Sequence, residues 1–369
     1  MPLLIGAFYF FYFSIVAIYV IFLPKVLTMV GYTPSEIGFI FAAGPLVRFG
    51  LPFLFLKGVK LNQSIFNIAL ALLSLATISF FFTLEHFWPL LISNIVMGMG
   101  MSLILPYIEV IALSLIGKES YGKVRLFGSI GFILVALTLV KFLNVPVTAL
   151  LFLLIVVSAT VLFAYSIAHV DSKKIVVAES IEGKQLDILA HWPLWLGLTL
   201  MQVSFGPFYN FFTIYETAHG ISLETTIYLW SFGVIAEIIL FYFQGPLLQR
   251  NLLKLLEFSL LLTVIRWLLT YAYAQNLYVL YFAQSLHAFS FALFHTAAIS
   301  FLYALYSERK LAQQFFFGIT YGLGGFVGAI SAGYIYELWP SFLFLYAAVI
   351  AFIALLSIRL SSKLPTNRS

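Results

Sequence analysis

Long apolar stretches separated by short polar breaks run along the whole chain. Each stretch is long enough to cross a hydrocarbon core of about 30 Å as a helix. The pattern predicts twelve membrane-spanning helices. Their expected ranges are 4–29, 35–56, 63–83, 88–116, 122–143, 146–169, 191–217, 223–247, 252–274, 277–305, 314–336 and 340–360. The predicted fold class is therefore an all-α membrane protein. The first apolar run has no basic segment before it and is longer than the core of a signal peptide, so we predict a retained helix.

Composition excludes a soluble domain. Hydrophobic residues make up 63% of the 369 residues and charged residues only 9%, whereas soluble domains carry about 25% charged residues. The chain has no Cys, which excludes disulfides, thiolate metal sites and Cys nucleophiles. We expect no metal or other cofactor. The net charge of +5 does not indicate nucleic acid, because the basic residues are scattered between apolar runs. The expected partners are the lipid bilayer, a small-molecule substrate and protons.

Lys and Arg mark one side of the membrane. The breaks after the even-numbered helices, together with the C-terminal tail, contain Lys57, Lys60, Lys118, Lys123, Lys173, Lys174, Lys184, Arg250, Lys254, Arg309, Lys310, Lys363 and Arg368. The breaks after the odd-numbered helices contain none. By the positive-inside rule, both termini are expected in the cytoplasm, with the protein in the bacterial inner membrane.

The longest polar stretch lies in the middle of the chain and predicts two halves. We expect an N-terminal six-helix bundle at 1–170, a cytoplasmic linker at 171–187, and a C-terminal six-helix bundle with a short cytoplasmic tail at 188–369. The segment "GYTPSEIGFIFAAGPLVRF" resembles "GISLETTIYLWSFGVIAEI", which places Arg48 opposite Glu237. Two pseudo-symmetric bundles of this kind are the architecture of the major facilitator superfamily, with substrate bound near the midplane between them.

Ionisable residues inside the predicted helices are candidate functional groups. Each costs at least about 2.5–3.5 kcal/mol to insert at a helix centre. They are Arg48, Glu109, Arg125, Glu216, Glu237, Arg266, His287 and His295. Ion pairs that only orient the bundle are one explanation, but buried pairs often fail to outperform apolar replacements. A polar cavity for solute and protons explains the set jointly. The glycine-rich runs "GMGMS" and "YGLGGFVGAISAGY" are instead expected to let helices pack closely.

The segment "YGKVRLFGSIGFI", residues 121–133, resembles the helix-5 signature of the lactose permease and phenylpropionate permease branch of this superfamily. The segments "FFYFSIVAIYVIFLP", "EIGFIFAAGPLVRF", "GVIAEIILFYF" and "SLHAFSFALFHTAAISF" also match, in order along the chain. The resemblance implies that Arg125 hydrogen-bonds the substrate and that Glu109 is its acidic partner. It also implies that Glu237, Arg266 and His287 link substrate binding to proton movement.

The chain departs from the family pattern at one position and in one loop. The lactose permease carries a carboxylate three residues after the histidine, where this chain has Ser290. A serine hydroxyl does not titrate in the pH range in which a carboxyl group does. We therefore expect Glu237 to carry the proton, with His287 or His295 as relays. The loop "KGVKLNQS" also differs from the superfamily's Gly-Asp-Arg loop.

These features predict a secondary transporter rather than an enzyme. The leading hypothesis is a proton-coupled symporter that imports a sugar-like solute, such as a galactoside, or an aromatic acid, such as phenylpropionate. The expected substrate-binding residues are Glu109, Arg125, Arg48, Tyr19 and Trp230. A drug or metabolite efflux carrier is the alternative. A membrane-embedded enzyme or receptor is a third, but no HExxH, GxSxG or GxxxxGK[ST] motif supports one. We expect a functional monomer.

Overall fold

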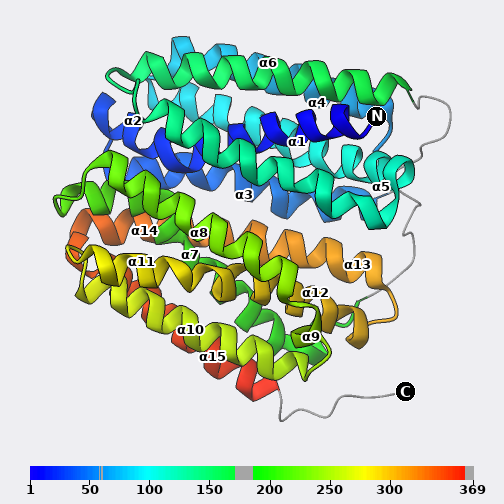
Figure 1. Cartoon of the computed structure of the whole chain (residues 1–369), viewed down its shortest axis with the longest axis vertical. Helices are drawn as coiled ribbons and strands as arrows, with labels where there is room; N and C mark the ends of the chain where they lie inside the picture. The colour runs from blue at the N-terminus through cyan, green and yellow to red at the C-terminus, as the bar shows by residue number, and fades with distance from the viewer. Residues whose placement is uncertain (58, 60, 171–185, 362–369) are drawn as a thin grey trace. The chain divides into compact units, whose positions relative to one another are not determined.

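The computed structural model describes residues 1–57, 59, 61–170 and 186–361, and these residues form helices joined by short connections (Figure 1). Contacts divide the chain into two compact units, Met1–Glu182 and Gly183–Ser369. Most of the expected linker, residues 171–185, lies outside the described residues.

The N-terminal unit contains six helices with one π-helical insertion. Their bounds are α1 Pro2–Ala17, η1 Ile18–Phe22, α2 Leu23–Val30, α3 Pro34–Leu56, α4 Gln63–Thr83, α5 Phe87–Leu139 and α6 Pro146–Val170. The first span runs without a break through α1, η1 and α2 as Pro2–Val30. Helix α5 packs against α1, α3 and α4 and so forms the centre of this unit.

Helix α5 covers two expected spans in one run of 53 helical residues. A straight helix would place Glu109 and Arg125 about 24 Å apart, at 1.5 Å per residue. Their side chains nevertheless approach to 3.8 Å. The chain must therefore reverse its direction between these two residues while its backbone stays helical. The predicted polar break is a bend within α5 rather than a loop.

The C-terminal unit has the same number of spans in more pieces. The elements are η2 Leu189–His191, α7 Trp192–Ala218, α8 Leu223–Phe243, α9 Gly245–Leu248, α10 Leu252–Ala272, α11 Leu277–Ser285, η3 Ala288–Leu293, α12 Phe294–Leu305, α13 Arg309–Phe315, η4 Phe316–Leu323, α14 Gly324–Leu338, η5 Pro340–Phe342 and α15 Leu343–Ser361. The π-helical segments η3 and η4 join shorter α-helices into continuous spans. Such wide turns often mark functional positions in helices.

Ten helices among the described residues are long and apolar enough to cross a membrane by length and composition. The other two expected spans are α7, with 27 residues, and α10, with 21. At 1.5 Å per residue, even 21 residues reach about 31 Å, the thickness of the hydrocarbon core. These two helices carry the buried Glu216 and Arg266.

Matching turns mark the internal repeat. Gly31 and Gly220 are the residues with positive φ among those described, at 107° and 88°. Each follows the end of a helix, where glycine adopts the left-handed conformation at little steric cost. The next helix then begins with a side-chain cap. Thr33 and Glu36 cap α3 reciprocally, and Ser222 accepts a hydrogen bond from the Thr225 backbone N–H at the start of α8.

Glycines bring helices of the C-terminal unit into backbone contact, as the glycine-rich run predicted. A Cβ added at Gly206 of α7 would lie 2.2 Å from the carbonyl oxygen of Gly328 in α14. A Cβ added at Gly324 would lie 2.7 Å from the carbonyl oxygen of Thr199. No real Cβ tolerates such distances to backbone, so α7 and α14 can pack this closely only with glycine.

We expect the substitution Gly206→Ala to destabilise the protein, because α7 and α14 must separate to admit the methyl group. Overpacking of this kind costs about 1–3 kcal/mol. Thermal unfolding of the purified protein in detergent should show a lower Tm. Gly50→Ala is the control, because nothing lies within 4 Å of a Cβ added there. Equal Tm values for the two variants would contradict the close packing.

Candidate functional site

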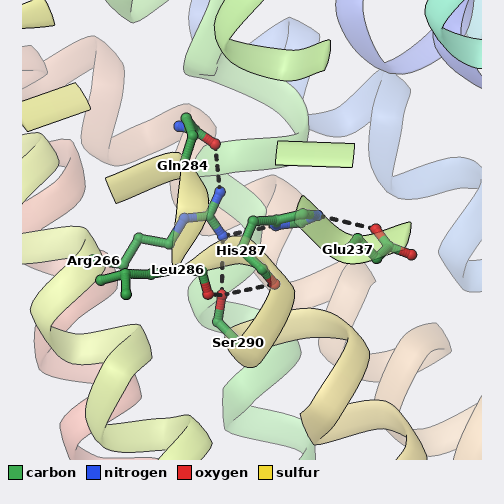
Figure 2. A network of polar contacts seen from close by, with 6 residues as sticks. All are labelled: Glu237, Arg266, Gln284, Leu286, His287 and Ser290. Atoms are coloured by element: carbon green, nitrogen blue, oxygen red, sulfur yellow. Dashed lines mark hydrogen bonds and ion pairs between the residues drawn. The ribbon is translucent and has the colours of Figure 1, made fainter. Parts of the chain in front are cut away.

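A buried arginine organises the first group of functional side chains. Arg266 of α10 is completely buried. It donates from Nη1 to His287 Nδ1 at 2.9 Å and to Ser290 Oγ at 3.2 Å, and from Nη2 to Gln284 Oε1 at 3.0 Å (Figure 2). Glu237 of α8 lies on the other side of the histidine. We refer to Glu237, Arg266, Gln284, His287 and Ser290 as the Arg266 cluster.

The hydrogen bond from Arg266 determines which nitrogen of His287 carries a proton. A guanidinium only donates, so Nδ1 of His287 must accept. A neutral imidazole then carries its proton on Nε2, the atom that lies 3.5 Å from Oε2 of Glu237. A second proton on His287 would have to displace Arg266. In this arrangement Nδ1 of His287 accepts from Arg266, and the protonated Nε2 faces the carboxylate of Glu237.

Aromatic rings cover the guanidinium of Arg266. Its Cζ lies 4.3 Å from the ring centroid of Phe208 on α7 and 4.4 Å from that of Trp267. Trp230 of α8 lies 4.2 Å from Phe208, ring to ring, and donates its indole N–H to Thr213. The faces of these rings attract a cation electrostatically. Trp230, an expected substrate residue, thus reaches the Arg266 cluster through Phe208.

Two members of the cluster were not assigned from the sequence. Gln284 lies one helical turn before His287, on the same face of the span. Its place in an apolar helix was a usable signal, because a buried amide requires a partner. The sequence marks Ser290 only as the position where the lactose permease has a carboxylate. In the structure its hydroxyl accepts from Arg266 and donates to the Leu286 carbonyl oxygen at 2.9 Å, within the π-helical η3.

His295 belongs to a separate pair. Its Nδ1 shares a 2.6 Å hydrogen bond with the hydroxyl of Tyr321 in η4. Between it and His287 lies Phe291, whose ring stacks on both imidazoles at centroid distances of 5.4 and 6.2 Å. An aromatic ring carries no exchangeable proton, so Phe291 interrupts any direct transfer between the two histidines.

The N-terminal unit contains a second group, which we call the Arg125 cluster: Tyr9, Phe13, Glu109, Tyr121 and Arg125. Glu109 Oε1 lies 3.8 Å from Arg125 Nε and accepts a hydrogen bond from the Tyr121 hydroxyl at 3.1 Å. The Arg125 guanidinium lies 3.9 Å from the Phe13 ring centroid and 5.1 Å from that of Tyr9. About a third of each charged side chain is exposed. The bend in α5 is what brings Glu109 and Arg125 together.

Two other expected substrate residues are placed differently. Tyr19, in η1, donates its hydroxyl to Asn94 Oδ1 at 2.7 Å, and Asn94 in turn donates to the Ile40 carbonyl oxygen. Arg48 lies on α3 with an exposed side chain. The described contacts join neither residue to Glu109 or Arg125. No group of three or more potential metal ligands occurs among the described residues.

Residues 3–347 match the MFS_1-like family. Over 364 residues the chain is 27% identical to the "Probable 3-phenylpropionic acid transporter" of Escherichia coli (strain K12), and the alignment covers 93% of each protein. Among solved structures, a variant of the nucleoside transporter NupG superposes with a TM-score of 0.83 at 16% identity, covering 98% of this chain and all of that one. An auto-inhibited POT family peptide transporter gives 0.76 at 11% identity, covering 100% and 98%. At these identities the likeness shows the fold alone, and it confirms the predicted fold class.

Proposed function

Because the chain belongs to the MFS_1-like family of the major facilitator superfamily, a family of secondary transporters and not of enzymes, we propose that it imports a small aromatic carboxylate together with protons. It is a multi-pass membrane protein that carries small molecules. The narrower proposal names 3-phenylpropionate and its close analogues as the solute. It also names the inner membrane as the location, with both termini cytoplasmic as the Lys and Arg distribution predicts.

The observation that carries the solute class is the state of Arg125. The hydrogen bonds between described residues include none to its terminal nitrogens, and its side chain is 30% exposed. Two parallel N–H donors of a guanidinium match the two oxygens of a carboxylate. Phe13 and Tyr9, already against the guanidinium, offer an aromatic face to a ring. The name of the Escherichia coli relative supports the same class of solute.

The Arg266 cluster supports proton coupling. Its members accept hydrogen bonds from both terminal nitrogens of Arg266, and the protonated Nε2 of His287 faces Glu237. A carboxyl group that changes protonation between two access states is what a symporter requires. We therefore propose that Glu237 binds the transported proton, with Arg266 and His287 as positioning residues. His295, which forms a hydrogen bond with Tyr321, is proposed as a proton relay that is separate from the Arg266 cluster.

A sugar-like solute is the second candidate. The Arg125 fork also fits two adjacent hydroxyl groups, and the Glu109 carboxylate beside it can accept from a third. Uncharged sugars would need both residues, whereas an aromatic acid needs Arg125 alone and tolerates a neutral residue at position 109.

Uptake into proteoliposomes tests the proposal. With an acidic exterior, we expect accumulation of labelled 3-phenylpropionate and none of galactosides or nucleosides. Protonated phenylpropionic acid crosses lipid unaided and is trapped in an alkaline lumen. Protein-free liposomes under the same gradient are therefore the reference, and only saturable uptake above them counts.

Each other outcome selects a different function. Saturable uptake of a galactoside without phenylpropionate would favour the sugar-like solute. Gradient-driven export from preloaded vesicles, without import, would favour the efflux carrier. Import of phenylpropionate that an uncoupler leaves unchanged would contradict proton coupling.

A further inference from the structure

One buried carboxyl group belongs to neither cluster. Glu216 lies near the end of α7, its exposed fraction is 0%, and neither carboxyl oxygen has a hydrogen-bond partner among the described residues. An isolated carboxylate in apolar surroundings is so costly that the group holds a proton instead. In this conformation burial without a partner favours the neutral, protonated form of Glu216.

The titratable groups near Glu216 are mainly tyrosines. Tyr215 is its neighbour on α7, and Tyr271 of α10 and Tyr336 of α14 lie close to Tyr215. His219 lies one helical turn further on, with its Nδ1–H donated to the Tyr215 carbonyl oxygen at 2.8 Å. No Lys or Arg among the described residues forms an ion pair with Glu216. Among the residues that the structure describes, no cation and no hydrogen-bond donor compensates a negative charge on Glu216.

An open depression lies close to this carboxyl group. The depression of about 880 Å³ occupies the same end of the C-terminal unit, at the α7–α8 and α10–α11 connections. Tyr215 and His219, which flank Glu216 on α7, both line it. By the charge distribution this is the expected periplasmic end. A small outward movement of the last turn of α7 would open Glu216 to this depression.

The same helix connects Glu216 with the Arg266 cluster. Phe208 and Phe212 precede Glu216 by eight and four residues, so the three side chains lie along one side of α7. Phe212 contacts Trp230 at 5.7 Å between ring centroids, and Phe208 lies 4.3 Å from the Arg266 guanidinium. A movement of the end of α7 would therefore shift the Phe208 ring that contacts the Arg266 guanidinium.

We propose that Glu216 is a second proton-binding site, and that release of its proton into the depression opens this end of the C-terminal unit. The O–H bond breaks, the proton passes to water, and the carboxylate left behind requires hydration. Hydration is reached by moving the last turn of α7 away from α15, whose Phe344 ring lies 4.8 Å from that of Tyr215. The site does not depend on which solute is carried or on the role of Glu237.

Cysteine labelling tests this proposal, since the natural chain has no Cys. Ala274 lines the depression and is only 7% exposed, whereas Ser341 lines it and is exposed. Purified Ala274→Cys and Ser341→Cys proteins in nanodiscs would be alkylated with a maleimide over a pH series. The ratio of the two rates removes the pH dependence that the two thiols share, and the Glu216→Gln background corrects for the remainder. We expect this ratio to rise several-fold as pH increases.

With Glu216→Gln the ratio should stay at its low-pH value throughout, because the amide mimics the protonated acid. Glu216→Met, similar in size and not ionisable, should give the same flat profile. Glu257→Gln should keep the native profile, because Glu257 pairs with Arg359 and does not line the depression. A rise that persists in Glu216→Gln, or no rise in the native background, overturns the proposal. The assay contains neither solute nor gradient, so its failure leaves the proposed solute and coupling untouched.

Discussion

Replacing Glu237 by Gln should abolish accumulation of solute driven by a proton gradient while leaving exchange of solute across the membrane largely intact. Exchange requires only that the loaded carrier changes its access, with no net deprotonation. Glutamine keeps the size of the side chain and can still accept from His287 Nε2, which lies 3.5 Å from the carboxylate in the native protein. The Arg266 cluster should therefore remain assembled, and the substitution removes only the ability of residue 237 to gain or lose a proton.

Parallel measurements of uptake and counterflow in proteoliposomes check this result. Glu257→Gln is the matched control, because it removes a carboxylate from an ion pair with Arg359, whose side chain is half exposed. Surface pairs of this kind contribute only about 0–1 kcal/mol. This control should accumulate solute normally. If Glu237→Gln still concentrates solute, the proton travels elsewhere, and His287 or His295 becomes the next residue to neutralise.

The second large effect is expected at Arg125, where Lys should weaken substrate binding by roughly 10- to 150-fold. An ammonium cannot reproduce the planar pair of donors, and a charge-assisted hydrogen bond contributes about 1.5–3 kcal/mol. Lys also loses the flat contact of the guanidinium with the Phe13 ring, 3.9 Å away. Half-saturation concentrations for counterflow measure the effect without relying on a proton gradient.

Two comparisons make this measurement specific. Lys123→Arg exchanges the same two residue types two positions earlier, at an exposed side chain, and should leave half-saturation unchanged. Inhibition by 3-phenylpropionamide, which lacks the carboxylate, should change little between the native protein and Arg125→Lys. An unchanged half-saturation for phenylpropionate in Arg125→Lys would remove Arg125 from the substrate site.

The pair at the centre of the Arg125 cluster was accessible from the sequence, because Arg125 lies in the recognisable segment 121–133 and the family resemblance assigned Glu109, on the preceding predicted span, as its acidic partner. The expected partners, Glu109 and Arg125, are in contact. The other expected substrate residues are not part of this contact. The sequence around Tyr19 gives no indication of its partner, because Asn94, which accepts a hydrogen bond from the Tyr19 hydroxyl, lies 75 residues away. Arg48 was assigned by repeat position, which defines a level on a helix but not a neighbour.

The Arg266 cluster shows the same division. Its charged members stood out because ionisable residues in a membrane span are costly. Ser290 joins the Arg266 cluster from η3, where a π-helical turn changes which side chains share a face. His295, placed on the same span by the sequence, instead meets Tyr321 in η4. Each of these two contacts, Arg266–Ser290 and His295–Tyr321, includes a residue in a π-helical turn, and such turns cannot be located from hydropathy.

The sequence by itself determined the helical spans, their number and the two-fold repeat of the protein. It could do so because lipid obliges every spanning segment to satisfy its own backbone, so length and apolarity suffice to identify a helix. It also determined which residues were too costly to lie there without a role. The tertiary structure alone decided which side chains are in contact. It decided the bend that joins Glu109 to Arg125, the tautomer of His287, and the isolation of Glu216. Such contacts depend on how each helix is rotated about its own axis relative to its neighbours. Glycine contacts between helices and π-helical turns within them set that rotation.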